Sequence, residues 1–190
     1  MAYIFNNQGI YKVPEVHPYI LMVRQQPMPA MVALASGSCQ SDLQLVQQGE
    51  GFRACKYNDT KGIPTICYGY NLSRGQARSD ITSVGGNYDS VMAGGCLTQS
   101  QCTTLLNKDM GSARSGAQSV FGTLKCSCAQ AVAVDMTYNL GTAGIRGFPN
   151  FIASMKSGNW SKASADAKDS LWCRQVGTRC TRDTNQIMMC

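Results

Sequence analysis

Apolar positions recur at helical spacing along much of the chain after residue 40. The first such stretch follows Ser41, a favourable N-cap residue, and the second follows Thr98, which can form a capping box with the glutamine three residues later. We expect this second helix to be interrupted near Gly111 or Gly116. The stretch 127–140 is apolar on nearly every face, which is typical of a helix buried at the centre of a lobe. The predicted helices are 41 to 49 or 51, 98–121, 127–140, 149–157 and 161–172.

Caps and helix breakers predict where the later helices begin and end. Ser127 is expected to cap the apolar helix, and Gly141 is expected to end it. Pro149 suits the first position of the next helix, because its missing N–H has no intrahelical partner there. Gly158 then stops that helix, and Ser161 begins the last one.

Between the first two helices the pattern changes to one typical of strands. Residues 52–57 and 63–68 are β-prone, and a polar segment closed by glycine, 58–62, separates them. This arrangement predicts a β-hairpin. Residues 71–95 are rich in glycine and serine, so we expect loop there with a short irregular strand.

Residues 1–38 differ in composition from the rest. They hold four of the six prolines, and residues 30–36 resemble the end of a signal peptide with a small-x-small cleavage site. We therefore interpret 1–38 as a leader or signal-like segment outside the fold, and 39–190 as the folded domain. A domain of that length can bury a sizeable core.

Two carboxylates are the candidate chemistry. Glu50 falls at the end of the first predicted helix, and Asp59 falls in or beside the hairpin turn. Two carboxyl groups on separate, rigidly joined elements can face each other across a cleft, which suits the acid and base of glycoside hydrolysis. Glu50 could instead be a helix-end charge, and Asp59 a residue that closes the turn with its side chain. Spacing alone favours this structural explanation.

The residues around these carboxylates resemble a known family, the phage-type (T4-like) lysozymes. The resemblance implies that Glu50 is the general acid and that Asp59 and Thr65 hold and polarise the attacking water. Two positions depart from the family pattern, since Cys67 replaces a glycine and Tyr70 replaces a histidine; we expect Tyr70 to tune substrate binding. The matching strings are Glu50-Gly51-Phe52-Arg53, Tyr57-Asn58-Asp59-Thr60-Lys61-Gly62, and Thr65-Ile66 with Gly69.

The resemblance extends over residues 43–183 and implies two further site residues. The string Tyr138-Asn139-Leu140-Gly141 places Asn139 at a sugar-contacting position, although a polar cap at the helix end is a close alternative. Arg179 matches an arginine that pairs with the catalytic glutamate in relatives, and a nearby cation would lower the pKa of a carboxyl group. A solvated surface arginine is the alternative.

The charge balance limits the possible partners. The net charge is +6, with one histidine and only two glutamates among the acidic residues. A basic protein favours anionic partners such as bacterial wall polymers. No run of lysine and arginine interleaved with aromatic residues favours nucleic acid, and no apolar stretch of about 18 residues predicts a membrane span.

Ten cysteines spread over the domain predict about five disulfides and an oxidising compartment. Neither CxxC spacing nor nearby histidines favour a metal site, because the one histidine, His17, lies in the leader. Buried free thiols are the less favoured alternative. Our guesses for local pairs are Cys55–Cys67, Cys96–Cys102 and Cys173–Cys180.

The resemblance therefore implies an α+β, lysozyme-like fold, with a small β-hairpin lobe, a larger helical lobe and a cleft between them. It implies hydrolysis of β-1,4 bonds between N-acetylmuramic acid and N-acetylglucosamine in peptidoglycan, without a cofactor. The cysteines favour a secreted antibacterial or digestive protein, which we expect to be a monomer. The alternatives are a non-catalytic cationic wall-binding or membrane-disrupting protein on the same fold, and a chitin hydrolase.

Overall fold

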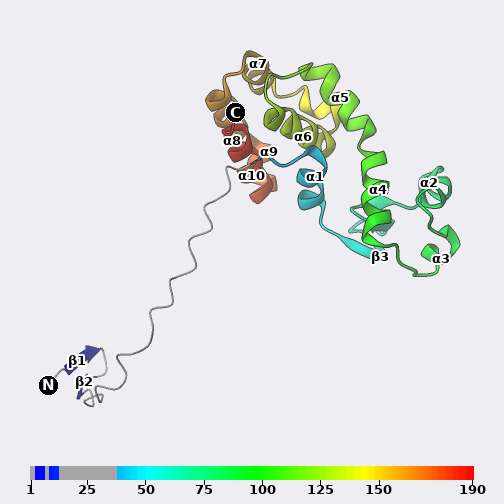
Figure 1. Cartoon of the computed structure of the whole chain (residues 1–190), viewed down its shortest axis with the longest axis horizontal. Helices are drawn as coiled ribbons and strands as arrows, with labels where there is room; N and C mark the ends of the chain where they lie inside the picture. The colour runs from blue at the N-terminus through cyan, green and yellow to red at the C-terminus, as the bar shows by residue number, and fades with distance from the viewer. Residues whose placement is uncertain (1–2, 7–8, 13–37) are drawn as a thin grey trace. The chain divides into compact units, whose positions relative to one another are not determined.

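The computed structural model describes residues 3–6, 9–12 and 38–190 of the chain (Figure 1). The chain divides into two units, Met1–Ser38 and Cys39–Cys190. In the first unit, strands β1 (Tyr3–Asn6) and β2 (Gly9–Lys12) pair antiparallel. The small-x-small site predicted at 30–36 and His17 lie outside the described residues, and the assignment of 1–38 as a leader stays a prediction.

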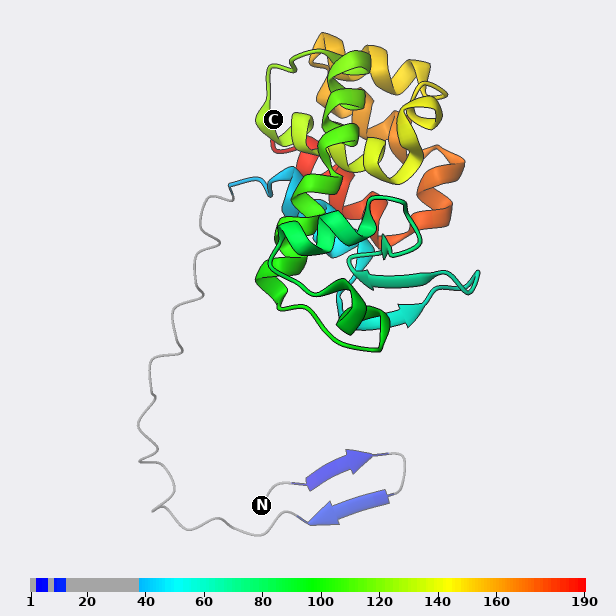
Figure 2. The same cartoon turned by 90° about the vertical axis from the view of Figure 1, so that its right-hand side faces the viewer.

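The second unit has two lobes, and its mixture of helices with one small antiparallel sheet confirms the predicted α+β class. The sheet gathers with α2 and α3 at one end, α5 to α10 gather at the other, and α4 runs between them (Figures 1 and 2). The elements in chain order are α1 (Asp42–Glu50), β3 (Arg53–Asn58), β4 (Pro64–Cys67), β5 (Tyr70–Asn71), α2 (Ala77–Ser83), α3 (Tyr88–Met92), α4 (Gln99–Asp109), α5 (Gly111–Phe121), α6 (Ser127–Ile145), α7 (Pro149–Ser157), α8 (Trp160–Lys168), α9 (Leu171–Val176) and α10 (Thr178–Ile187).

The predicted hairpin is confirmed as β3 and β4, and β5 adds a short third strand. The loop predicted for 71–95 is wrong in part, because α2 and α3 form there. Asn87 caps α3 by accepting a hydrogen bond from the Ser90 N–H, and Ile81 and Val91 are buried anchors of the two helices. Helices with so few anchors leave little periodic signal in a Gly- and Ser-rich background.

The helix predicted from Thr98 is two helices, α4 and α5, that meet at Met110, next to the predicted break at Gly111. The capping box of Thr98 and Gln101 is confirmed: each side chain accepts a hydrogen bond from the other residue's backbone N–H. Met110 is fully buried, so the junction of the two helices lies inside the core.

Helix α6 lies at the centre of the large lobe, as its apolar composition predicts, and packs against α1, α5 and α10. Gly116 of α5 allows this close approach, because a Cβ there would lie 2.1 Å from Thr142 Oγ1. One boundary prediction is wrong, because Cys126 rather than Ser127 is the N-cap residue. The predicted end at Gly141 is confirmed as a break: Gly141 is non-helical (φ 73°), and a further short helical stretch follows it to Ile145.

The C-terminal helices pack as a layer around α6 and α8. Pro149 occupies the first turn of α7, as predicted. The single helix predicted for 161–172 is wrong: α8 begins one residue earlier after its cap Asn159, and α9 begins after a second cap, Ser170. Asparagine and serine are favoured as caps because their side chains accept hydrogen bonds from the free N–H groups of the first turn.

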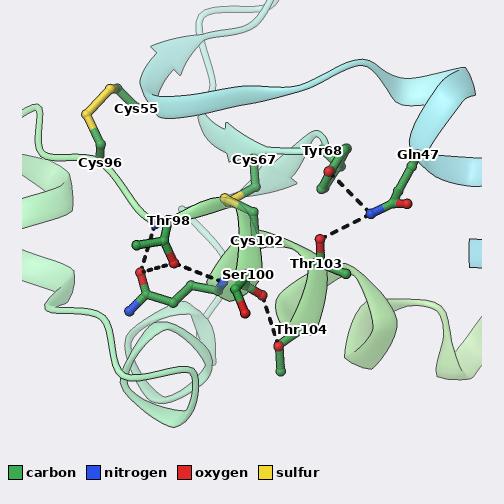
Figure 3. The surroundings of a disulfide bond; sticks show 11 residues. Gln47, Cys55, Cys67, Tyr68, Cys96, Thr98, Ser100, Cys102, Thr103 and Thr104 are labelled. Atoms are coloured by element: carbon green, nitrogen blue, oxygen red, sulfur yellow. Dashed lines mark hydrogen bonds between the residues drawn. A yellow bond between two sulfur atoms is a disulfide. The ribbon is translucent and has the colours of Figure 1, made fainter. Parts of the chain in front are cut away.

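All ten cysteines form disulfides, which confirms the predicted framework of five. Cys173–Cys180 is confirmed, whereas the guesses Cys55–Cys67 and Cys96–Cys102 are wrong. In the hairpin Cys67 lies opposite Arg53, and Cys55 instead forms a bridge with residue 96 of the following segment. Figure 3 shows Cys55–Cys96, at the segment before α4, and Cys67–Cys102, which reaches α4 itself. The five pairs are Cys39–Cys128, Cys55–Cys96, Cys67–Cys102, Cys126–Cys190 and Cys173–Cys180.

Both ends of the second unit are fastened at the beginning of α6, through Cys128 and Cys126. Gln186 of α10 reinforces this point. Its amide accepts a hydrogen bond from the Gln40 N–H at 3.0 Å and donates to the carbonyl oxygens of Gln40 and Cys128. The first and last turns of the unit are thereby held to the same place in the core.

The Cys67 backbone generates a stability prediction. Cys67 has φ 61°, a left-handed conformation that costs a non-glycine residue roughly 1–2 kcal/mol, while closing its disulfide to Cys102 should contribute about 3–4 kcal/mol. We expect the double variant Cys67→Gly/Cys102→Ala to be more stable than Cys67→Ala/Cys102→Ala by about 1 kcal/mol, with both less stable than the wild type. Urea unfolding midpoints measure the order; equal midpoints for the two double variants would contradict it.

Candidate active site

Glu50 is the last residue of α1, and the chain enters the sheet directly after it. Gly51 makes this turn possible with φ 72°, a conformation that favours glycine. A Cβ placed on Gly69, which follows β4, would lie 3.9 Å from Glu50 Oε2. The Glu50 carboxyl group therefore lies where the helical lobe meets the backbone of the small lobe.

The other oxygen of Glu50 is paired with Arg179 of α10. Arg179 Nη1 donates to Glu50 Oε1 at 2.8 Å, and the same guanidinium donates from Nε and Nη2 to the two carboxylate oxygens of Asp135, at 2.8 and 2.9 Å. Arg179 is 7% exposed and Asp135 of α6 is fully buried. The predicted pairing of Arg179 with Glu50 thus exists in the structure.

Burial by itself would lower the pKa of Arg179, but hydrogen bonds and charges from Asp135 and Glu50 outweigh it and hold the pKa above its usual value. The guanidinium is thus a permanent cation beside Glu50. Gly49 allows this placement, because a Cβ at that position would lie 2.7 Å from Arg179 Cζ. A larger residue would push Arg179 away from α1.

A cavity of about 360 Å³ opens between the two lobes beside Glu50. Its walls come from the end of α1, the turn after β4, α4, α5 and α6. A cleft between lobes is the usual place for a ligand site. The lining residues are Glu50, Tyr68, Gly69, Arg74, Asp109, Ser112, Ala113, Thr137, Tyr138, Gly141 and Thr142.

Polar groups that the sequence analysis missed lie in this cavity. Arg74 forms an ion pair with Asp109, and the Tyr138 hydroxyl donates to the other oxygen of Asp109 at 3.4 Å. Burial raises the pKa of Tyr138, and the negative charges of Asp109 and Glu50 add to the effect. Tyr138 therefore keeps its proton and presents a neutral hydroxyl beside Asp109.

Tyr68, another wall of the cavity, is fixed from behind by Gln47 of α1. The Gln47 amide donates to the Tyr68 hydroxyl at 3.3 Å and to Thr103 Oγ1 of α4 at 3.1 Å, as Figure 3 shows. The ring of Phe52, which is 43% exposed, lies with its centroid 5.2 Å from that of Tyr68. Phe52 thus covers Tyr68 from outside the cavity lining.

A second cavity, of about 470 Å³, lies on the other side of the Glu50–Arg179 pair. Asn139 lines it together with Glu50, Arg179 and Arg182. The Asn139 side chain is not a helix cap here: its Oδ1 accepts a hydrogen bond from Trp172 Nε1 at 2.8 Å. A role for Asn139 in sugar binding stays a prediction.

Asp59 and Thr65 lie together on the hairpin, outside the lining of the cavity that contains Glu50. Asp59 Oδ1 accepts hydrogen bonds from the N–H groups of Lys61 and Ile63, at 2.8 and 2.9 Å, and so fixes the turn. Thr65 is 4% exposed, and its hydroxyl donates to the Ile63 carbonyl at 2.9 Å. Their part in holding a water stays a prediction.

Tyr70 lies in a neighbouring cavity of about 320 Å³, which shares Asp109 and Ser112 with the first. Its hydroxyl donates to Asp80 Oδ2 at 2.7 Å. Burial and the adjacent Asp80 raise the pKa of Tyr70, whereas Lys108, by its hydrogen bond, lowers the pKa of Asp80. The expected contact of Tyr70 with substrate stays a prediction.

The described residues also bear on metals and membranes. The sulfur atoms of Cys126, Cys128 and Cys190 lie within 4.8 Å of one another, but each belongs to a disulfide and is not a free thiolate ligand. Among the helices described, each one is too short or too polar to cross a bilayer.

Comparison with known proteins identifies the family. A model of the phage lysozyme family matches residues 47–182. The chain belongs to this family. One curated relative is the pre-baseplate central spike protein Gp5 of Enterobacteria phage T4, which is 26% identical over 156 residues. That alignment covers 76% of this chain and 27% of Gp5, so the chain spans about a quarter of the relative's length. Family membership supports a lysozyme-like glycosidase function.

Within this family match, Asp135 is a further site residue that the sequence analysis passed over. A signal for it existed, because Asp135 is the one charged residue in the apolar stretch 127–140. A lone charge in a buried helix needs a counter-ion. No comparable signal marked Arg74 and Asp109, which the fold brings together across 35 residues.

The Tyr70–Asp80 hydrogen bond gives a testable prediction. We expect Tyr70→Phe to lower the free energy of unfolding by about 1–2 kcal/mol at neutral pH, because a hydrogen bond to a buried carboxylate is lost. The folded-state pKa of Asp80 lies below its unfolded value, so ionised Asp80 stabilises the fold above that unfolded value and ceases to do so as the pH falls through the folded pKa. Urea unfolding of both proteins from pH 7 to pH 3 should show the difference shrinking with acidity; a constant difference would contradict this explanation.

Proposed function

We propose that this protein is a lysozyme that hydrolyses the β-1,4 bond between N-acetylmuramic acid and N-acetylglucosamine in bacterial peptidoglycan. The observation that carries the proposal is the position of the Glu50 carboxyl group in this member of the phage lysozyme family. Arg179 holds one of its oxygens, and the carboxyl group borders the cavity between the lobes. Such a carboxyl group can deliver a proton to a glycan in that cavity.

Glu50 would act as the general acid. Arg179 occupies Oε1, so the proton would be delivered from Oε2, on the side of Gly69, which lines the cavity. Protonation of the leaving glycosidic oxygen by a positioned carboxyl group typically accelerates such reactions 10²–10⁴-fold. Tyr138 and the Arg74–Asp109 pair would offer hydrogen bonds to sugar hydroxyls in the same cavity.

Asp59 and Thr65 would hold the attacking water. One Asp59 oxygen is used by the hairpin turn, which leaves Oδ2 for a water molecule, and the turn fixes where that oxygen lies. Attack by water opposite the leaving group inverts the anomeric carbon, as the family resemblance implies. The roles of acid and base reside in carboxyl groups, so this reaction requires no cofactor.

The framework of five disulfides supports secretion into an oxidising compartment, as in an antibacterial or digestive enzyme. The net charge of +6 would favour adsorption to anionic bacterial walls. We propose that the protein acts there as a monomer.

The Glu50→Gln variant tests the acid. It keeps the side-chain shape and an acceptor for Arg179 but removes the transferable proton, so clearance of a cell-wall suspension should fall at least about 100-fold while wall binding persists. Asp89→Asn, an exposed position on α3, is the matched control and should clear walls at the wild-type rate. Lysis by Glu50→Gln at the control rate would contradict the mechanism, and wall binding by a wild-type protein that never lyses would favour the non-catalytic alternative.

The Asp59→Asn variant tests the water. The amide can still accept the turn hydrogen bonds through its oxygen, so the melting temperature should stay close to that of the wild type. Turnover should fall at least about 100-fold because a base has been lost. NMR of the first products from the wild type should show the inverted anomer; net retention would overturn the assignment of Asp59 to the water.

A further inference from the structure

The Glu50–Arg179 pair belongs to a larger group of charges at the junction of α1, α6 and α10, of which Asp135, Asp183 and Arg179 are buried and Glu50 is exposed. It contains two arginines and three carboxyl groups: Arg179, Arg182, Glu50, Asp135 and Asp183. Arg182 Nη2 donates to Asp135 Oδ2 at 3.3 Å and to Asp183 Oδ1 at 2.9 Å. Asp135 thus receives hydrogen bonds from both arginines.

Asp183 is the unusual member of this group. It is 1% exposed, and its Oδ2 is buried without a hydrogen-bond donor. An ionised carboxylate oxygen left without a donor in the interior carries a large desolvation cost. A protonated Asp183 avoids this cost, because its O–H can donate to the carboxylate of the neighbouring Asp135.

The charges agree with this protonation. Two arginine cations face Asp135 and Glu50, so the group is neutral when those two are ionised and Asp183 is not. Burial raises the pKa of Asp183 to about 8, and the negative charge of Asp135 adds to the effect, whereas Arg182 opposes it. A neutral Asp183 thereby keeps Asp135 as the single anion that faces both arginines from the interior.

Other charged groups near α10 are engaged elsewhere. On α8, Lys162 pairs with Asp166, and on α9 the Arg174 guanidinium donates to the Asp169 carbonyl. Lys168 of α8 is exposed. Helices α6, α8 and α9 pack against α10. Among their described residues, Asp135 is therefore the charged side chain that contacts Arg179 and Arg182.

We propose that Asp135 is a positioning residue for the general acid, and that a neutral Asp183 supports it. Asp135 accepts two hydrogen bonds from Arg179 and is its main counter-ion, whereas Glu50 accepts one hydrogen bond from it. Glu50 then does not serve as the main counter-ion of a buried arginine, and it can accept and deliver a proton. The catalytic part of this inference rests on the proposed lysozyme function.

The prediction concerns the titration of the Glu50 carboxyl group, which can be measured without turnover. The chain has two glutamates, Glu15 and Glu50, so labelling glutamate with ¹³C at the carboxyl carbon gives two signals, and Glu50→Gln assigns them. Asp135→Asn removes a negative charge one guanidinium away from Glu50. We expect it to move the Glu50 titration midpoint about one pH unit lower, a roughly tenfold loss of proton affinity.

Two further variants are expected to affect the Glu50 midpoint differently: one should raise it, and the other should leave it unchanged. Gly49→Ala adds a methyl group where Arg179 now lies and should displace the cation, so the Glu50 midpoint should rise. Asp183→Asn copies the protonated carboxyl and should leave the midpoint unchanged below pH 7. Asp183→Asn should also unfold at increasingly higher urea concentration than the wild type between pH 4 and pH 8, because a folded-state pKa above the unfolded value costs the wild type stability across that range.

A purely structural role would change melting temperatures without moving the Glu50 signal. An unchanged midpoint in Asp135→Asn would overturn the proposal, as would a downward shift in Asp183→Asn. If Asp135→Asn does not fold, Gly49→Ala decides, because a midpoint that stays at the wild-type value would show that Arg179 does not govern Glu50. Failure of the proposed function would appear separately: the wild type would not lyse walls, or lysis would survive Glu50→Gln, while these midpoints still move.

Discussion

Burying one arginine constrains the whole large lobe. Arg179 is almost fully removed from water, and a guanidinium in that position requires carboxylate partners in a fixed geometry. It finds them on α1 and α6, so three helices that are distant in sequence must meet at one point. The same requirement places Glu50 at the border of the cavity between the lobes. Stability of the junction and placement of the Glu50 carboxyl group are therefore one arrangement, and glycine at position 49 is part of it.

The small lobe is held together by different means. It consists of a three-stranded sheet and two short helices, and a unit of this size has a limited hydrophobic core. Covalent bonds compensate: Cys55–Cys96 joins the first strand to the segment before α4, and Cys67–Cys102 joins the second strand to α4 itself (Figure 3). The Arg74–Asp109 ion pair adds a link between this lobe and the end of α4. The small-lobe wall of the cavity is thus joined to α4 and the segment before it by disulfides and by an ion pair.

Local chemistry made much of this fold predictable. The cap at Ser41, the capping box at Thr98 and the proline at 149 each act within one turn, and each is confirmed. Disulfide pairing depends on tertiary distances, so guesses from sequence proximity failed for Cys55–Cys67 and for Cys96–Cys102, six residues apart, and succeeded for Cys173–Cys180.

The residues of the candidate site also differ in how far the sequence predicted them. Glu50 and Arg179 were identified through resemblance to a family, and the structure brings them into contact. Asp183 gave no signal, since an aspartate next to an arginine in a polar helix resembles a surface residue until burial is known. Protonation is a property of the assembled interior rather than of the local sequence.

The two disulfides at the beginning of α6 have a mechanical consequence. Cys39 is bonded to Cys128, and Cys190 is bonded to Cys126, so a covalent path between the first and last cysteines crosses only residues 126–128. Tension applied at Cys39 and Cys190 travels along this short route and never loads the hairpin, the central helices or the charged junction around Arg179. While those two bonds are intact, pulling on either end of residues 39–190 cannot draw the lobes apart.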